Sequence, residues 1–187
     1  MIIGWGLLNN SIENQVLQFS RDKVDYFKQE KLIPENAKVG LALQLCLDTD
    51  FQGNGIIQKV YSYLETLTND RFDVIEASVR KNNPAGIAIT QNLRFETILE
   101  DNIRIYKIKK TNNTTTNKAK VELKFGDQWI VIRKGEIGDE IELFELNKKW
   151  LDINSDDNSK GFLTSLYQPE DYKIIIESND IVVAELI

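Results

Sequence analysis

The residues that point most directly to chemistry form a short turn, Gln52-Gly53-Asn54-Gly55, between an apolar strand and a helix expected to begin at Ile56. The first backbone N–H groups of a helix have no acceptor within it, and the helix dipole places partial positive charge there. The two glycines keep side chains away from those groups. The turn is therefore predicted to bind an anion, although the same pattern also occurs in turns with a purely structural role.

Two common phosphate-binding motifs do not fit this turn. No Gly-Lys-Ser/Thr follows it, which excludes a P-loop, and the third glycine of the dinucleotide-binding fingerprint is missing. The chain contains no histidine, which excludes Ser/His/Asp triads, Cys/His dyads, HExxH metal sites and every histidine general base. Any catalysis must use other groups, and no metal is expected.

The single cysteine and the N-terminal sequence indicate a reducing compartment. Cys46 has no second cysteine to pair with and lies in an apolar run, where a packed and inert thiol is expected. The first residues lack the basic start and cleavage site of a secretory signal. The apolar stretches are also too short to cross a bilayer. The chain is predicted to be cytoplasmic, with no membrane contact.

Charge is distributed unevenly along the 187 residues, whose net charge is −6. Residues 1–117 carry 14 basic and 14 acidic side chains, whereas residues 118–187 carry 9 and 15. Phosphate neutralisation requires a lysine or arginine patch. An acidic second segment therefore argues against nucleic acid as a partner.

The first segment alternates strands and helices, which is typical of an α/β fold. Strands are predicted at 2–8, 39–47, 72–79, 95–99 and 104–108, and helices at 11–32, 56–68 and 84–92. A polar linker is predicted at 111–117. After it, short β-like runs at 121–125, 129–133, 140–146, 172–177 and 181–187 predict a small, acidic all-β domain over 118–187.

Two stretches of the first segment carry a family resemblance. Residues 45–56, LCLDTDFQGNGI, resemble motif A of the GNAT superfamily of acyl-CoA N-acyltransferases, in which an apolar strand runs into a Gln/Arg-x-x-Gly-x-Gly/Ala turn. Residues 79–95, VRKNNPAGIAITQNLRF, resemble motif B, a strand followed by an asparagine and a short helix. Ile3-Gly-Trp-Gly6 is similar to the strand that precedes motif A. The resemblance covers about residues 1–108 and implies the C-terminal part of the GNAT fold.

The resemblance implies a function for these residues. It implies an N-acetyltransferase that uses acetyl-CoA as co-substrate and acts on an unidentified amine, with direct attack of the amine on the thioester. The pantetheine arm would pair with main-chain groups of Leu45, Cys46 and Leu47 and be flanked by Asn83. The pyrophosphate would rest on the N–H groups of Gln52, Gly53, Asn54, Gly55, Ile56 and Ile57.

The sequence departs from the family pattern at three positions and in its overall extent. Ile57 stands where a small residue is usual, Thr90 where a tyrosine acid is usual, and Arg94 where the helix usually ends in glycine. No catalytic residue is assigned, although Asp48 and Asp50 flank the turn as candidate bases or turn caps.

The resemblance also implies strands and helices before residue 2. Either the second segment or a second copy of the chain would then replace these elements and cover the open sheet edge, or the chain would be a truncated relic of the fold. The alternative function is a catalytically degenerate binding or assembly protein, whose acidic segment contacts a basic partner.

Overall fold

The structure is a computed structural model that describes residues 1–8, 15–68, 70–111, 120–153 and 167–187. The strands are β1 (Ile2–Leu8), β2 (Val39–Leu47), β3 (Val74–Arg80), β4 (Glu96–Glu100), β5 (Arg104–Lys110), β6 (Val121–Phe125), β7 (Gln128–Lys134) and β8 (Ile181–Leu186). The helices are α1 (Gln15–Gln29), α2 (Ile56–Thr68), α3 (Pro84–Asn92), α4 (Glu140–Ile153) and α5 (Pro169–Glu177), with a short 3-10 turn, η1 (Thr49–Phe51). The chain is a mixed α/β protein.

The eight described strands form one mixed sheet in the order β4-β5-β3-β2-β1-β8-β7-β6. Among these neighbours, only β2 and β3 are parallel. The helix α2 connects them, as a parallel crossover requires. The strand β1 lies in the middle of the sheet, and all seven of its residues are buried.

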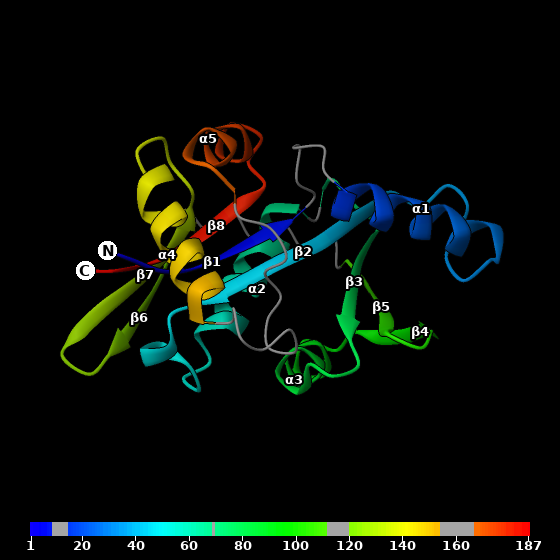
Figure 1. Cartoon of the computed structure of the whole chain (residues 1–187), viewed down its shortest axis with the longest axis horizontal. Coiled ribbons are helices and arrows are strands. Elements are labelled where there is room, and N and C mark those ends of the chain that lie inside the picture. The colour runs from blue at the N-terminus through cyan, green and yellow to red at the C-terminus, as the bar shows by residue number, and fades with distance from the viewer. Residues whose placement is uncertain (9–14, 69, 112–119, 154–166) are drawn as a thin grey trace.

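Helices cover both faces of the sheet (Figure 1). On one face, α2 and α3 pack over side chains such as Ile75 and Ala77. On the other face, α4 and α5 pack against β1 and β8, and α1 packs against β2, β3 and β5. Gly6 permits the close approach of α2, because a Cβ there would lie 3.1 Å from Cγ1 of Val60.

Strands β6 to β8, from the second segment, extend the same sheet. β8 pairs with the outer edge of β1, from Ile2 opposite Glu185 to Leu7 opposite Ile181. β8 therefore covers the edge of β1 that was expected to be open. This shared sheet gives no support to a separate second domain, and the predicted linker at 111–117 lies almost entirely outside the described residues.

Two expected strands in the second segment are helices. Residues 140–146 belong to α4 and residues 172–177 to α5, so the all-β prediction for 118–187 is wrong. Leu143, Leu146 and Trp150 follow the helical three-to-four spacing and share one core with α5. Pro169 opens α5, and Gln168 and Asp171 form a capping box.

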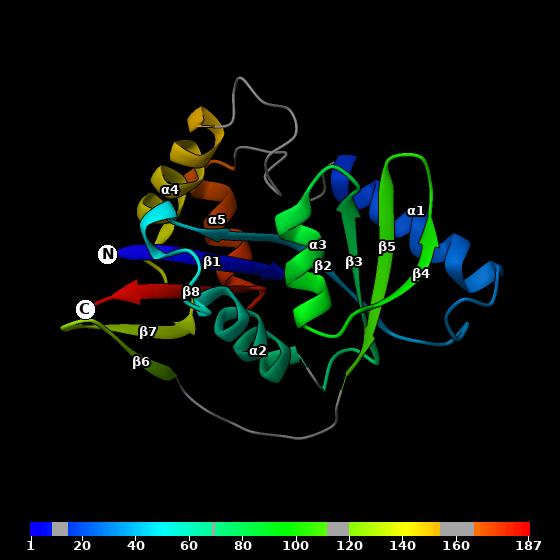
Figure 2. The same ribbon diagram turned by 90° about the horizontal axis from the view of Figure 1, so that it is seen from below.

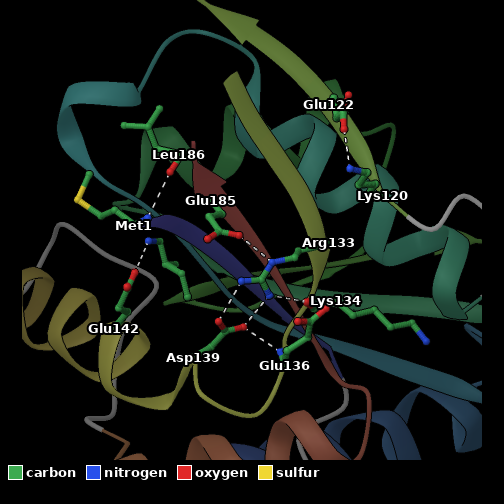
Figure 3. A network of polar contacts seen from close by, with 11 residues as sticks. Met1, Lys120, Glu122, Arg133, Lys134, Glu136, Asp139, Glu142, Glu185 and Leu186 are labelled. Carbon is green, nitrogen blue, oxygen red and sulfur yellow. Dashed lines mark hydrogen bonds and ion pairs between the residues drawn. The ribbon is translucent and has the colours of Figure 1, made fainter. Parts of the chain in front are cut away.

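The two ends of the chain lie side by side (Figures 1 and 2). The N-terminal amine of Met1 donates to the carbonyl of Leu186 at 3.2 Å, and the N–H of Leu186 donates to the carbonyl of Met1 at 2.8 Å. Close by, the guanidinium of Arg133 pairs with Asp139 and Glu185 at 2.7 and 2.9 Å (Figure 3). These contacts hold β7, β8 and the start of α4 together around the chain ends.

Candidate functional site

The parallel strands β2 and β3 separate toward their C-terminal ends. They pair only from Val39 opposite Val74 to Leu41 opposite Glu76. Beyond that point β2 continues against β1, while β3 continues against β5 as far as Arg80. The divergence is visible in Figure 2, where the two arrows point in different directions. A split between parallel strands leaves main-chain groups without a ladder partner on that side.

The main-chain groups of Leu45, Cys46 and Leu47, which were predicted to pair with the pantetheine arm, do not all face the same side of β2. The N–H of Asp48 donates to the carbonyl of Ile3 at 2.7 Å, and Cys46 lies opposite Trp5. Because main-chain groups alternate sides along a strand, those of Cys46 face β1 and those of Leu45 and Leu47 face the split. The carbonyl of Leu47 accepts from Nε2 of Gln52 at 3.4 Å. Leu45 and Leu47 thus offer main-chain groups to the split, but Cys46 does not.

The thiol of Cys46 is buried beneath α4 and α5. Its side chain is 3% exposed and belongs to the core that contains Trp5 and Tyr172. Burial, reinforced by the negative charge of Asp48, raises the pKa of Cys46 far above its ordinary value. Cys46 is therefore a packed, protonated thiol, which agrees with the inert role expected from the sequence.

The turn from Gln52 to Gly55 is exposed and directly precedes α2. Gly53 and Gly55 have φ angles of +78° and +72°, in the left-handed region that favours glycine. The side chain of Asn54 donates back to the carbonyl of Gln52 at 2.9 Å, which stabilises the turn. A Cβ at Gly53 would have no neighbour within 4 Å, so the space above the turn is open.

The two isoleucines after the turn do not obstruct it. Ile56 is 2% exposed, and Ile57 is partly buried against the same core as Val60 and Leu64. Their side chains therefore point inward. Ile57 therefore leaves the turn open although a small residue is usual at its position, and the first N–H groups of α2 face outward as at any helix start.

Asn83 and Thr90 serve the helix α3 itself. Oδ1 of Asn83 accepts from the N–H of Gly86 at 2.9 Å, which makes Asn83 the N-cap of α3. The hydroxyl of Thr90 is 5% exposed and donates to the carbonyls of Gly86 and Ile87 at 3.0 Å. Thr90 has no hydroxyl proton to offer a leaving group, and Asn83 has a structural role that the resemblance did not imply.

Asp48 links the end of β2 to α4. Its carboxylate accepts from Nζ of Lys149 at 2.7 Å and from the N–H of Asp50 at 3.4 Å. Burial alone would raise the pKa of Asp48, but the hydrogen bonds from Lys149 and Asp50 hold it below its ordinary value. A carboxylate of this kind is a weak base near neutral pH.

A buried carboxyl on β3, that of Glu76, was not predicted from the sequence. Glu76 is 3% exposed, and its Oε1 atom has no hydrogen-bond partner among the described residues. Burial raises the pKa of Glu76 to about 8, against the opposing charge of Arg104. The signal was present in the strand sequence VIEASVR, where Glu76 follows Val74 on the face that α1 covers.

No family model matches the chain, and no curated protein matches it. Within the described ranges, no helix is both long and apolar enough to span a membrane. The same part of the chain contains no group of three or more histidine, cysteine or acidic side chains that could hold a metal ion.

Proposed function

We propose that the chain is an acetyl-CoA-dependent N-acyltransferase that acts on a small amine. The observation that carries this proposal is the split between β2 and β3, combined with the glycine turn that leads from β2 into α2. A CoA thioester consists of an extended arm rich in amides and an anionic pyrophosphate. The split supplies strand edges that pair with no described strand and could receive the arm, and the turn supplies N–H groups for the pyrophosphate.

The arm is expected to pair with β2 as an added strand would. Leu45 and Leu47 present the main-chain groups for this pairing, and the open turn at Gly53 and Gly55 lies immediately beyond them. This proposal retains Leu45, Leu47 and residues 52–57 from the sequence analysis. It removes the main chain of Cys46 from the set, because that residue faces β1.

The order of the sheet also supports the GNAT-like interpretation. The resemblance implies strands and helices that precede the strand Ile2–Leu8. In this chain β7, α4, α5 and β8 come last in the sequence, yet β8 lies beside β1 and the chain ends adjoin. We interpret β7, α4, α5 and β8 as those elements, carried at the other end of the chain in a circularly shifted order.

The reaction would need little more than correct positioning. The acceptor nitrogen attacks the thioester carbonyl, the C–N bond forms as the C–S bond breaks, and the CoA thiolate leaves while the nitrogen loses its proton. Holding two reactants together in one site supplies a large part of such a rate enhancement. The catalytic acid and base are not assigned, and the internal hydrogen bonds of Thr90 remove that residue as the acid.

The occupied hydroxyl of Thr90 also favours the second candidate, a protein that binds acyl-CoA without catalysis. Both candidates require the same cofactor site and differ only in turnover. Acetyl-CoA saturation followed by an amine screen separates them, because the non-catalytic candidate binds the thioester but releases no CoA thiol.

A matched pair of substitutions tests the cofactor site. Gly53 and Gly126 both have positive φ angles and open space around the Cβ position, but Gly126 lies in the β6–β7 turn, outside the residues 52–57 that would hold the pyrophosphate. Aspartate tolerates the left-handed conformation and adds negative charge. Gly53→Asp is expected to weaken acetyl-CoA binding at least about ten-fold, whereas Gly126→Asp changes it by less than about two-fold. Equal binding by both variants would place the cofactor elsewhere.

A further inference from the structure

The strand β6 forms one edge of the sheet, and its outer side pairs with no described strand. It ends the strand order beyond β7, far along the sheet from the edge of β1 that β8 covers (Figure 2). Its pairing with β7 is regular over Val121–Phe125. Proteins usually protect such an edge with proline, a bulge or unanswered charges. The sequence of β6, VELKF, contains no proline and no glycine, so the edge can accept another strand.

The main-chain groups that point away from the sheet are those of Glu122 and Lys124. A two-residue turn closes the β6–β7 hairpin, so the flanking residues Phe125 and Gln128 form a hydrogen-bonded pair. Main-chain groups alternate sides along a strand, and Leu123 therefore also bonds toward β7. The N–H and C=O groups of Glu122 and Lys124 face outward, where an added strand would meet them.

The side chains of β6 alternate between an apolar face and a charged face. Val121, Leu123 and Phe125 are partly buried against the core that contains α2. Glu122 and Lys124 are exposed on the opposite face. This order of charges makes β6 complementary to an antiparallel copy of itself, because each Glu122 would face Lys124 of the partner subunit.

One register satisfies the main chain, the charges and the apolar row together. It is symmetric about Leu123, which faces its own copy, and it places Val121 opposite Phe125 of the partner subunit. Each Glu122–Lys124 pair then exchanges both of its outward main-chain hydrogen bonds. Sliding the strands by two residues would instead place Glu122 opposite Glu122, or Lys124 opposite Lys124, and opposed like charges destabilise a strand pair. A slip of one residue would place apolar side chains opposite charged ones.

The edge strand at the other end of the sheet, β4, is protected against the same pairing. Its register with β5 shifts between Thr97 and Leu99, and an irregular edge accepts a new strand poorly. Its two ends are Glu96 and Glu100. A symmetric antiparallel pair would place these glutamates opposite each other, which is unfavourable. The contrast favours β6 as the edge that interacts.

We infer that β6 pairs with β6 of a second copy of this chain, antiparallel and symmetric about Leu123, to form a dimer with one continuous sheet. The charge order of β6 identifies the partner, since the strand that answers it is β6 itself. A two-fold contact of this kind is self-complementary and closes at two copies. The inference goes beyond the proposed function and uses none of the observations that support the cofactor site.

Charge reversal tests the pairing by sedimentation equilibrium of the full chain. The wild-type chain is expected to form dimers with a dissociation constant of micromolar order. Glu122→Lys and Lys124→Glu each create two pairs of opposed like charges and are expected to raise that constant at least about ten-fold. The double variant Glu122→Lys/Lys124→Glu restores opposite charges and is expected to return within about three-fold of wild type. Glu96→Lys is the control on β4 and should change the constant by less than about two-fold.

Cysteine cross-linking tests the register. Opposed residues of a non-hydrogen-bonded pair have Cα atoms about 4.5 Å apart, within the range of about 4.4–6.8 Å that a disulfide spans. Leu123→Cys is therefore expected to give a covalent dimer on mild oxidation. Val121→Cys is not, because Val121 faces Phe125 of the partner subunit, and Thr97→Cys on β4 is not. Cys46 is buried and stays in all variants.

Three results would overturn the β6 interface. The first is a wild-type chain that remains monomeric at all concentrations up to about 1 mM. The second is a dimer that keeps its wild-type affinity in both single charge reversals while circular dichroism shows each variant to be folded. The third is equal cross-linking by Leu123→Cys, Val121→Cys and Thr97→Cys.

Discussion

The N–H of Leu186 donates to the carbonyl of Met1 at 2.8 Å, so the two ends of the chain meet as neighbouring positions of an antiparallel strand pair. A short turn joins such strands in most proteins. The sheet would therefore tolerate a direct connection from β8 to β1. That connection would make residues 120–187 precede β1, the order that the GNAT-like interpretation requires.

Circular permutation tests this relationship. A chain with Ile187 joined to Met1 by a short glycine-asparagine linker, and with new ends within residues 112–119, is expected to fold and to unfold cooperatively. Adjacent ends favour such permutation. Circular dichroism and thermal unfolding provide the measurement. A control that is opened inside β2, between Leu41 and Ala42, is expected not to fold, because it breaks the centre of the sheet. Failure of the first permutant, while the linear chain folds, would contradict the account of the chain ends.

Glu76 is expected to make the protein less stable as pH rises. Its pKa is raised from 4.5 to about 8 in the folded state, so the folded chain binds more protons than the unfolded chain between those values. Stability therefore falls as pH increases through that window and levels off above it. Glu76→Gln is expected to remove this slope and to gain roughly 2 kcal/mol at pH 9.

Urea unfolding at pH 5, 7 and 9 measures the effect of Glu76. Glu96→Gln is the control, because Glu96 is exposed on the edge strand β4. The wild-type slope should persist in that variant. A Glu76→Gln protein that retains the full wild-type slope would show that another group titrates in this range.

Asn83 is expected to act through α3. Asn83→Ala removes the acceptor for the N–H of Gly86 and should lower the free energy of unfolding by about 1 kcal/mol. Asn83→Ser keeps a capping oxygen and should restore most of the loss. Chemical denaturation and acetyl-CoA titration are measured on both variants. If Asn83→Ser restores stability but not cofactor affinity, the carboxamide contacts the arm as the resemblance implies; if it restores both, Asn83 is a helix cap alone.

Cys46 is expected to resist modification in the folded chain. Its thiol is buried and its pKa is raised, so a thiol-specific disulfide reagent at pH 8 should react only after denaturation. The rate of colour release with and without urea measures this directly. Rapid reaction in the native state would contradict the burial of Cys46 and its role as an inert thiol.

The sequence predicted local elements well where two signals agreed. The bounds of α2 and α3 match the prediction, because an apolar face coincides with a glycine turn before α2 and with Pro84 at the start of α3. In α4, the apolar residues Ile141 and Leu143 imitate strand alternation. Ile141 is exposed in the helix, and only the longer spacing from Leu143 to Trp150 reveals the buried face.

Long-range pairing could not be predicted from local pattern. Nothing near Ile2 indicates that its neighbour in the sheet is Glu185, and nothing near Leu41 indicates that the pairing with β3 stops there. The opposed positions of Arg80 and Arg104 depend on the register of β3 and β5, which sequence spacing alone does not determine. The glycine turn was predictable because its function depends on consecutive residues.

Titration of acetyl-CoA into the full chain tests the central claim most directly, with desulfo-CoA and adenosine diphosphate as comparisons. The account predicts one saturable site of micromolar affinity, with desulfo-CoA bound comparably and adenosine diphosphate more weakly, because the arm and the pyrophosphate both contribute. Binding should be lost in Gly53→Asp and retained in Gly126→Asp. No binding of acetyl-CoA by a cooperatively folded wild-type chain would contradict the claim that the β2–β3 split and the turn at Gly53 form a CoA site.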